Sequence, residues 1–349
     1  MSPLVPASAG SASVLSASGI GLLARPWLLA DIGGTNARFG WLADGATAPS
    51  HVQTLACADH AGPAAAAAVY LSALSRQLGA SYRAPRAAAL AVATAVAGDQ
   101  VSFTNSGWSF SRSATRGALG LDALLVLNDF EALALSLPHL TVTQRRVFGP
   151  AALASAPCAA LAVIGPGTGL GVAGLLPRGT HWLAVPGEGG HASLAAADDF
   201  DAALLAAVRS RFAHVSAERL LSGIGLPVLH EGVAAVLGAA HAPFAAHEIV
   251  ERGLAGDDAV CSRTLDSFCA LLGGFAGNVA LTLGARGGVY IGGGIVPRLG
   301  ERFYASAFRE RFEAKGRFAA YLAAVPTAVI TDTLAALTGT AVALEQHGG

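Results

Sequence analysis

A carboxylate and two adjacent glycines end an apolar segment near the start of the chain, where residues 28–42 read LLADIGGTNARFGWL. Glycines leave the N–H groups of a tight turn open to an anion, because no Cβ obstructs the approach. The Thr35 hydroxyl adds a hydrogen-bond donor, and Asp31 could hold a metal ion or its waters. The segment therefore predicts a strand–turn–strand in which Gly33, Gly34 and Thr35 bind the phosphates of a Mg-nucleotide. An ordinary hairpin with a glycine-rich turn is the alternative.

A second glycine-rich turn, GPGTGLG at residues 165–171, repeats this arrangement between two further apolar segments. A nucleotide held between two lobes needs N–H donors from both sides, so two such turns are a stronger signal than one. Neither is a P-loop, because the G-x-x-x-x-G-K-[ST] pattern does not occur. A strand rather than a helix is expected after each turn, which argues against a dinucleotide-binding fingerprint. Neither turn contains a lysine, so N–H dipoles and Mg²⁺ are expected to balance the phosphate charge.

Asn128 and Asp129 stand where an apolar strand, expected over Leu124–Leu127, meets a helix expected over Glu131–Leu137. A carboxylate at such a junction is well placed to act as a general base, with the neighbouring amide as a substrate ligand. Either residue could instead cap the helix that follows. The local sequence leaves both interpretations open.

Two further motifs carry acidic residues. The first, PGEGGH at Pro186–His191, places Glu188 and His191 three residues apart in a turn that is expected to be too glycine-rich for a packing element. This pair suits hydrogen bonds to vicinal hydroxyls of a sugar, and a metal site is the rival interpretation. The second, at Ser216–Gly223, resembles a displaced capping box that opens a helix. In that motif Glu218 could be a helix cap or a solvated charge.

Composition restricts the classes of function. A length of 349 residues favours two domains or one large two-lobed unit. The net charge of -1 gives no reason to expect a nucleic-acid partner. Prolines and glycines interrupt the long uncharged stretch 151–177, so no membrane-spanning helix is expected there. The four cysteines show no C-x-x-C spacing, which favours free thiols in a reducing, cytoplasmic setting.

The elements that must position these residues alternate between strands and helices. Strands are expected in a hairpin over 28–42, over 87–96, over 161–176 around the second glycine turn, and over 289–291 before Gly292–Gly294. Helices are expected over 61–78, 198–212 and 262–283. Mixed elements with two separate glycine-rich hairpins indicate two related α/β halves around a cleft. The uncharged residues 1–24 are expected to form a disordered extension.

In the order of its motifs the chain resembles the bacterial ATP-dependent glucokinase family, within the hexokinase–actin–Hsp70 type of fold. The resemblance runs from about Trp27 to Leu344. The motifs that carry it are Ala30–Phe39, Asn128–Ala132, Gly165–Val172, Pro186–His191, Glu218–Leu226, Gly292–Pro297 and Phe312–Phe318. It implies an α/β, two-lobed actin-like ATPase (ribonuclease H-like) fold with a central substrate cleft. The implied small lobe is 25–138 plus 330–349, and the implied large lobe is 139–329.

The resemblance also implies the ligands and their residues. ATP, Mg²⁺ and glucose would bind in the cleft, and glucose 6-phosphate would enter glycolysis. Asp129 would be the catalytic base for the sugar 6-hydroxyl, and Asp31 would hold Mg²⁺ through water. The implied glucose ligands are Asn105, Asn128, Asp129, Glu188, His191 and Glu218. The implied nucleotide-side residues are Asp31, Gly33, Gly34, Thr35, Asn36, Gly167, Thr168, Gly169 and Gly293. A homodimer is favoured as well, to which the Gly284–Gly288 turn could contribute.

Two segments depart from the family's pattern. Thr94–Asp99 lacks a usual proline, and Asp332–Gly339 lacks a usual Pro-Gly-Leu-Leu-Gly run. Both departures could alter lobe closure, although neither removes a catalytic group. A kinase for another hexose would keep Asp129 and change the contacts around the Glu-x-x-His motif. A sugar-sensing protein would lack the base or carry a DNA-binding segment, and a filament-forming ATPase would lack the Glu-x-x-His motif and the second glutamate.

Overall fold

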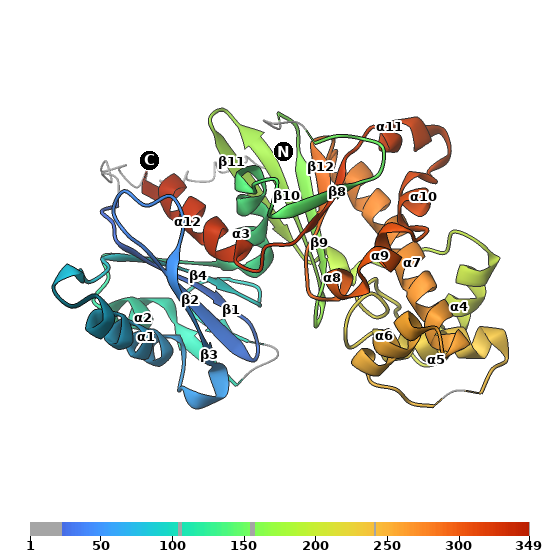
Figure 1. Cartoon of the computed structure of the whole chain (residues 1–349), viewed down its shortest axis with the longest axis horizontal. Coiled ribbons are helices and arrows are strands. Elements are labelled where there is room, and N and C mark those ends of the chain that lie inside the picture. Colours follow the sequence, from blue (N-terminus) through green and yellow to red (C-terminus); the bar gives the residue numbers. More distant parts are fainter. Residues whose placement is uncertain (1–22, 104–106, 154–157, 241, 349) are drawn as a thin grey trace, which may run out of the picture.

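The computed structural model describes residues 23–103, 107–153, 158–240 and 242–348 and has two lobes, each built on one large sheet (Figure 1). The first sheet has the strand order β3-β2-β1-β4-β7. Its strands are β1 (Trp27–Ile32), β2 (Asn36–Leu42), β3 (Ser50–Ala56), β4 (Ala87–Val92) and β7 (Ala123–Asn128). The second sheet has the order β11-β10-β9-β12-β13-β8. Its strands are β8 (Arg145–Phe148), β9 (Leu161–Pro166), β10 (Leu170–Arg178), β11 (His181–Gly187), β12 (Gly288–Ile291) and β13 (Thr327–Ile330).

The two sheets repeat one topology, which confirms the expectation of two related halves. In the first sheet, β1, β2 and β3 are antiparallel neighbours, and β4 and β7 continue parallel to β1. In the second sheet, β9, β10 and β11 form the antiparallel part, and β12 and β13 continue parallel to β9. The additional strand β8 pairs antiparallel with β13. Each glycine-rich turn therefore joins the first two strands of its half.

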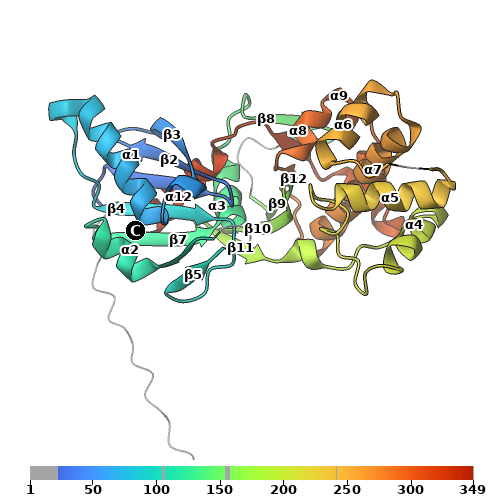
Figure 2. The ribbon, with the colours of Figure 1, turned by 90° about the horizontal axis from the view of Figure 1, so that it is seen from below.

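Helices cover the outer faces of the sheets and fill the space between them (Figure 2). On the first sheet lie α1 (Pro63–Leu78) and α2 (Arg112–Ala118), together with a small hairpin, β5 (Gln100–Ser102) and β6 (Ser109–Ser111). The second lobe contains α4 (Asp199–Arg209), α5 (Leu226–Leu237), α6 (Ala246–Ala255), α7 (Ala259–Leu283), α8 (Ile295–Leu299), α9 (Glu301–Tyr304), α10 (Phe308–Glu313) and α11 (Ala319–Ala323). Single 3-10 turns occur at Cys57–Asp59, Gly79–Ser81, Leu137–His139, Gly189–His191 and Gly316–Phe318.

Two helices, α3 (Asp129–Ser136) and α12 (Ala335–Gly348), lie between the sheets and join the lobes (Figure 1). Their backbones approach so closely that a Cβ atom on Gly339 would come within 1.7 Å of the Ala132 carbonyl oxygen. Both helices belong to a buried apolar cluster that also includes Leu29 of β1 and Val163 of β9. Because one continuous core connects the two sheets through α3, the position of α3 is fixed from both sides.

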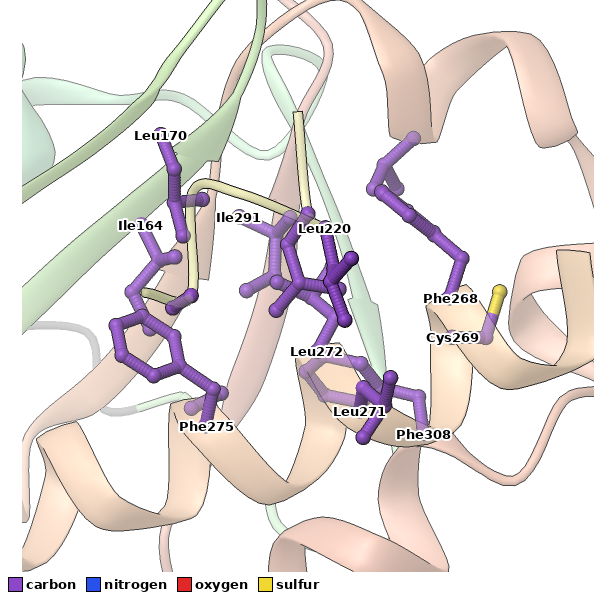
Figure 3. Close-up of a cluster of buried hydrophobic side chains, with 14 of the residues drawn as sticks. Ile164, Leu170, Leu220, Phe268, Cys269, Leu271, Leu272, Phe275, Ile291 and Phe308 are labelled. Atoms are coloured by element: carbon purple, nitrogen blue, oxygen red, sulfur yellow. The ribbon is translucent and has the colours of Figure 1, made fainter. Parts of the chain in front are cut away.

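A second core fills the larger lobe behind the six-stranded sheet (Figure 3). The long helix α7 contributes Phe268, Leu272 and Phe275, which pack against strand residues such as Ile164 and Ile291. Leu220 enters the same core from the loop before α5 and is completely buried. Burial of a leucine side chain contributes about 1.5–3 kcal/mol. This loop, which carries Glu218, is therefore held against the sheet although it has no regular structure.

The structure confirms most of the expected elements and adds several. The strand expected over 87–96 ends at Val92, and β11 was not expected at all. The expected helix opening at Ser216 is wrong: residues 216–225 form turns, and α5 begins at Leu226. Buried Leu220 and Leu221 hold these turns against the core, which an unbroken helix could not do in the same place.

Two further expectations concerned membrane-spanning segments and the Gly284–Gly288 turn. Within the described residues, α7 is the one helix long and apolar enough to span a membrane, and 72% of its most apolar window is buried inside the protein. The Gly284–Gly288 turn, expected as a dimer element, packs within the chain. The N–H of Gly287 donates to the Ala160 carbonyl oxygen at 2.9 Å, and a Cβ there would lie 2.7 Å from the Ala159 oxygen. Intramolecular packing therefore accounts for a glycine at 287.

Candidate active site

The first glycine turn connects β1 to β2 and is anchored by a charged pair. Asp31 and Arg38 are opposite each other in the ladder, with Arg38 Nη1 3.7 Å from Asp31 Oδ2. Burial raises the pKa of Asp31, and the Arg38 charge opposes that rise. The Gly33 N–H donates to the Asn36 carbonyl oxygen at 2.9 Å and closes the turn. Among the described residues, the N–H groups of Gly34 and Thr35 donate to no backbone acceptor, so they remain available to a ligand.

Asn128 and Asp129 lie where β7 meets α3, and the structure shows which of the two caps the helix. Asn128 is the helix cap: its Oδ1 accepts from the N–H groups of Phe130 at 2.9 Å and Glu131 at 3.4 Å. Its amide nitrogen donates to the Thr94 carbonyl oxygen at 3.2 Å, which ties α3 to the segment after β4. One amide hydrogen of Asn128 is left for a substrate. Asp129 is the first residue of the helix, so its carboxylate is not required as the cap.

The Asp129 carboxyl titrates near neutral pH. Burial raises its pKa to about 7, and the negative charge of Asp31 adds to the rise. A hydrogen bond from the Phe130 N–H at 3.0 Å opposes it, and the charge of Glu188 makes a smaller contribution upward. A carboxylate with a pKa near the operating pH is a stronger base than an ordinary aspartate and is still substantially ionised. These are the properties of a general base.

Phe130 holds the Asp129 end of α3 against the second sheet. A Cβ atom on Gly165 would lie 2.4 Å from the Phe130 ring, and one on Gly171 would lie 2.0 Å from it. The two glycines flank the second turn, one on β9 and one on β10. The absence of side chains at both positions therefore lets the aromatic ring rest directly on the sheet beside the turn.

The second glycine turn is held by the loop that carries Glu218. The Leu170 N–H donates to Glu218 Oε2 at 2.8 Å, and a Cβ on Gly169 would lie 2.5 Å from the same oxygen. The Gly223 N–H donates to the Gly167 carbonyl oxygen at 2.8 Å. Glycine at position 169 is thus required by the close approach of a carboxylate. Glu218 is neither a helix cap nor a freely solvated charge, because it fixes the turn.

His191 lies between two carboxylates from separate segments. Its Nε2 is 3.9 Å from Glu188 Oε2, and its Nδ1 is 3.8 Å from Glu218 Oε1. Glu188 and His191 are exposed, whereas Glu218 is mostly buried. The structure therefore brings together three of the residues that the sequence analysis associated with a sugar.

The segment that carries Glu188 packs more tightly than its composition suggested. Pro186 and Gly187 belong to β11, and Gly189–His191 form a 3-10 turn. A Cβ on Gly190 would lie 2.0 Å from the Leu170 carbonyl oxygen. The expectation that this segment is not a packing element is wrong, because glycine here permits contact between two backbones. Asn105, the remaining expected sugar ligand, lies outside the described residues.

A cavity of about 850 Å³ opens between the two glycine turns and the helices of the second lobe. The first turn and β2 contribute Asn36 and Arg38, and the second turn contributes Gly167 and Thr168. The remaining lining residues are Gly223, Leu226, Ala246, His247, Val250, Glu251, Leu254, Gly294, Ile295 and Arg298. Two arginines, Arg38 and Arg298, therefore line this cavity, although neither glycine turn contains a lysine.

The residues of α6 were missed, although the sequence contained a signal for them. His247, Val250, Glu251 and Leu254 follow one another at steps of three, one and three residues. This spacing is that of one helix face. The pattern predicts the helix, but only the fold directs this face toward the cavity.

Gly293 follows β12 in the chain, and its backbone packs against Gly165 and Pro166 at the second turn. Its φ angle is 77°, and a Cβ there would lie 2.3 Å from the Pro166 carbonyl oxygen. A side chain is excluded on both grounds. The neighbouring Gly294 is the N-cap residue of α8 and lines the cavity, so this glycine run lies between the second turn and the cavity wall.

Two phosphate-type turns in repeated halves, a partly buried carboxyl between them and a cleft cavity define a sugar kinase of the actin-like ATPase fold. The glucokinase family profile matches residues 28–347. A glucokinase of Aromatoleum aromaticum is 49% identical over 322 residues, covering 92% of this chain and 95% of the relative. One of Chromobacterium violaceum is 50% identical over 327 residues, covering 93% and 90%. The chain belongs to the glucokinase family and is an ATP-dependent hexose kinase.

A solved structure agrees with this assignment. The crystal structure of a glucokinase from an Antarctic psychrotroph is 39% identical and superposes with a TM-score of 0.83. The match covers 92% of this chain and 99% of the other. The similarity includes both lobes, so the fold class expected from the sequence is confirmed.

Proposed function

We propose that this chain transfers the γ-phosphoryl group of ATP to the 6-hydroxyl of glucose, giving glucose 6-phosphate and ADP, with Asp129 as general base. The supporting observation is the partly buried Asp129 carboxyl, whose pKa is raised to about 7 by loss of solvent and by the nearby Asp31. Asp129 accepts the hydroxyl proton as the oxygen attacks the γ-phosphorus, and later releases it to solvent. General-base assistance of this kind contributes about 10²–10⁴-fold to the rate.

The glycine turns and the two arginines bind the phosphates. The free N–H groups of Gly34 and Thr35 face the phosphates from one lobe, and the Thr168–Gly169 turn does so from the other. Arg38 and Arg298 supply fixed positive charge at the cavity wall. Phosphoryl transfer depends mainly on alignment and on stabilisation of charge at the transferring group. A site with donors from both lobes is complete only when ATP bridges them.

The donor set at Asp31 fits Mg²⁺. Mg²⁺ binds proteins through one or two carboxylates and otherwise through water and substrate phosphates. The half-buried Asp31 oxygens at the first turn match this preference. When bound, Mg²⁺ neutralises phosphate charge. Asp31 would hold it through water, and the ion pair with Arg38 restricts the Asp31 side chain.

The adenosine part fits the outer cavity. Leu226, Val250, Leu254 and Ile295 give that part of the wall an apolar surface, while His247 and Glu251 add polar groups. Ligand pockets typically combine an apolar lining with a few placed polar groups. This division supports a nucleoside outside the phosphate turns, with Gly293 packed beside the second turn.

Sugar recognition depends on Asn128, Asp129, Glu188, His191 and Glu218, with Asn105 as a further candidate. Each hydroxyl that is missing or inverted leaves a polar group unpaired, at about 1–3 kcal/mol per contact. The carboxylate–imidazole–carboxylate arrangement around His191 supports a preference for adjacent hydroxyls in one geometry. This favours glucose over its epimers.

Three wider proposals accompany the mechanism. The small lobe comprises 25–138 and 330–349, the large lobe comprises 139–329, and the lobes close on the sugar. Arg38 donates to the Thr333 carbonyl oxygen, so the connection between β13 and α12 is tied to β2 beside the first turn, within the small lobe. The enzyme acts in the cytoplasm as a homodimer. Light scattering after size-exclusion chromatography would reject the dimer if it gives the monomer mass at micromolar concentration.

A coupled glucose 6-phosphate assay with ATP and Mg²⁺ tests the proposed function. Wild type should turn over glucose, and Asp129→Ala should lose activity by orders of magnitude while glucose binding, measured by calorimetry, is largely kept. Asp129→Asn preserves the shape of the side chain and should be equally inactive. Glucose binding without turnover in wild type would indicate a sugar-sensing protein. Equal activity in wild type and both variants would show that Asp129 is not the base.

A further inference from the structure

Three side chains with metal-binding donor atoms meet where α5 packs against the start of α7, and none of them lines the cavity described above. His230 is on α5, Asp258 is the N-cap residue of α7, and Cys261 is the third residue of α7. One donor atom from each lies within 4.8 Å of the others. His230 and Cys261 are buried, and Asp258 is partly exposed. The group therefore has a closed side formed by a nitrogen and a sulfur and an open side formed by a carboxylate.

The spacing of the sulfur and the nitrogen matches that of two ligands on one tetrahedral ion. Cys261 Sγ lies 3.6 Å from His230 Nε2. A Zn–S bond of about 2.3 Å and a Zn–N bond of about 2.0–2.1 Å at the tetrahedral angle separate the two atoms by about 3.6 Å. Imidazole, thiolate and carboxylate are the ligand types that zinc uses. The side chains need little rearrangement to coordinate.

We propose that His230, Asp258 and Cys261 bind one zinc-class divalent cation that fastens α5 to the N-terminus of α7. Without the ion, the Cys261 thiol donates a hydrogen bond to the Asp258 carboxylate, which also accepts a hydrogen bond from the Cys261 N–H at 2.8 Å. On binding, the thiol proton leaves to solvent and the ion takes its place between sulfur and carboxylate. Water occupies the fourth position on the exposed Asp258 side.

The consequence for the cleft follows from chain order. The segment between His230 and Asp258 contains α6, which supplies His247, Val250, Glu251 and Leu254 to the cavity. An ion that joins the two ends of this segment restricts the motion of the helix between them. The site would thus stabilise one wall of the nucleotide cavity without touching the nucleotide.

Cobalt titration of the full-length protein, previously stripped of metal with a chelator, tests the site. A thiolate ligand gives Co²⁺ a near-ultraviolet charge-transfer band. We expect this band in wild type, saturating at one equivalent and displaced by Zn²⁺. Cys261→Ser should lose the band and bind Zn²⁺ at least tenfold more weakly. Asp258→Asn, which keeps a helix-capping side chain, should keep the fold and the band and weaken binding.

Cys158→Ser is the matched control, because Cys158 is exposed and remote from the cluster in the chain. It should leave the band unchanged. Loss of the band in Cys158→Ser with retention in Cys261→Ser would overturn the site, as would no saturable band in wild type. Hydrogen exchange tests the consequence: at a Zn²⁺ concentration that saturates wild type and leaves Asp258→Asn mostly unoccupied, exchange across α6 should slow in wild type and not in Asp258→Asn. Saturable binding with unchanged exchange in α6 would overturn the proposed effect on the cavity wall.

Discussion

The Phe130 ring rests where a side chain on Gly171 would stand, since a Cβ atom there would come within 2.0 Å of the ring. Phe130 follows the proposed base directly in the chain, and Gly171 lies on the strand that leaves the second phosphate-type turn. The contact therefore sets how closely the Asp129 end of α3 approaches the second lobe. A residue with no side chain thus determines, through the Phe130 ring, the position of the proposed base.

Gly171→Ala is expected to displace the Phe130 ring and, with it, the start of α3. Overpacking of this kind costs about 1–3 kcal/mol of stability. Activity should fall more than tenfold, because a misplaced base loses the alignment on which transfer depends. Melting temperature and kcat are the measurements. Gly274→Ala is the control: it lies on α7 with open space around its Cβ position and should leave both nearly unchanged. Wild-type kcat in Gly171→Ala would contradict the positioning role.

The pH dependence of activity should follow Asp129. Its carboxyl must be ionised to accept a proton, and burial, with the Asp31 charge added, raises its pKa to about 7. Below that pH, kcat/KM should fall about tenfold per pH unit. Asp31→Asn removes a neighbouring negative charge, so it lowers the pKa of Asp129 and moves the acidic limb to lower pH. An acidic limb that stays in place in Asp31→Asn would argue against the coupling of these two carboxyls.

The same carboxyl should reduce stability at neutral pH. Folded Asp129 keeps its proton up to about pH 7, whereas the unfolded residue loses it near the ordinary aspartate pKa of 3.8. The free energy of unfolding therefore decreases as pH rises from about 4 to 7, since the folded state binds the additional proton. Asp129→Asn should be more stable than wild type at pH 8, by about 1–3 kcal/mol, and equal to it near pH 4. Denaturant titrations at both pH values measure this difference. Asp44→Asn, at an exposed position, should show no such pH-dependent gain.

Arg298 should contribute to nucleotide binding and not to sugar binding. It lines the cleft cavity, and a charged contact to phosphate contributes about 1.5–3 kcal/mol. Arg298→Ala is expected to raise KM for ATP about tenfold or more and to change KM for glucose less than twofold. Arg178→Ala, an exposed arginine at the end of β10, is the control and should change neither. An equal rise in KM for ATP and for glucose would contradict a role of Arg298 in nucleotide binding alone.

Substitutions of His191 and Glu218 should differ in whether they raise KM for glucose alone or for both glucose and ATP. The His191 ring lies 3.9 Å from the Glu188 carboxylate and 3.8 Å from the Glu218 carboxylate, whereas Glu218 also accepts the Leu170 N–H that shapes the second turn. His191→Ala is expected to raise KM for glucose about tenfold and leave KM for ATP unchanged. Glu218→Ala should raise both, because the turn loses its anchor. Steady-state kinetics with each substrate varied in turn distinguish these outcomes, and an effect of Glu218→Ala on glucose alone would show that the turn holds without it.

Much of the site could be predicted because its residues lie in short continuous motifs. The turn after β1, the turn after β9 and the Asn128–Asp129 junction each combine an apolar strand with residues of special chemistry. Such local patterns depend on backbone freedom and burial, which adjacent residues reveal. The repeated glycine hairpins likewise predicted two related halves, and the two sheets share that topology.

The sequence by itself thus determined the chemistry-bearing groups and the family, whereas the tertiary structure decided what each group contacts. Whether Asn128 or Asp129 caps α3 depends on the segment after β4, 34 residues away, whose Thr94 carbonyl receives the Asn128 amide. Packing between distant segments brings Glu218 to the Leu170 N–H of the second turn and places one face of α6 along the cavity. The pKa of Asp129 also depends on how far the folded chain removes it from solvent and on the charge of Asp31. Contacts of this kind are set by how elements pack in three dimensions, and adjacent residues carry no record of them.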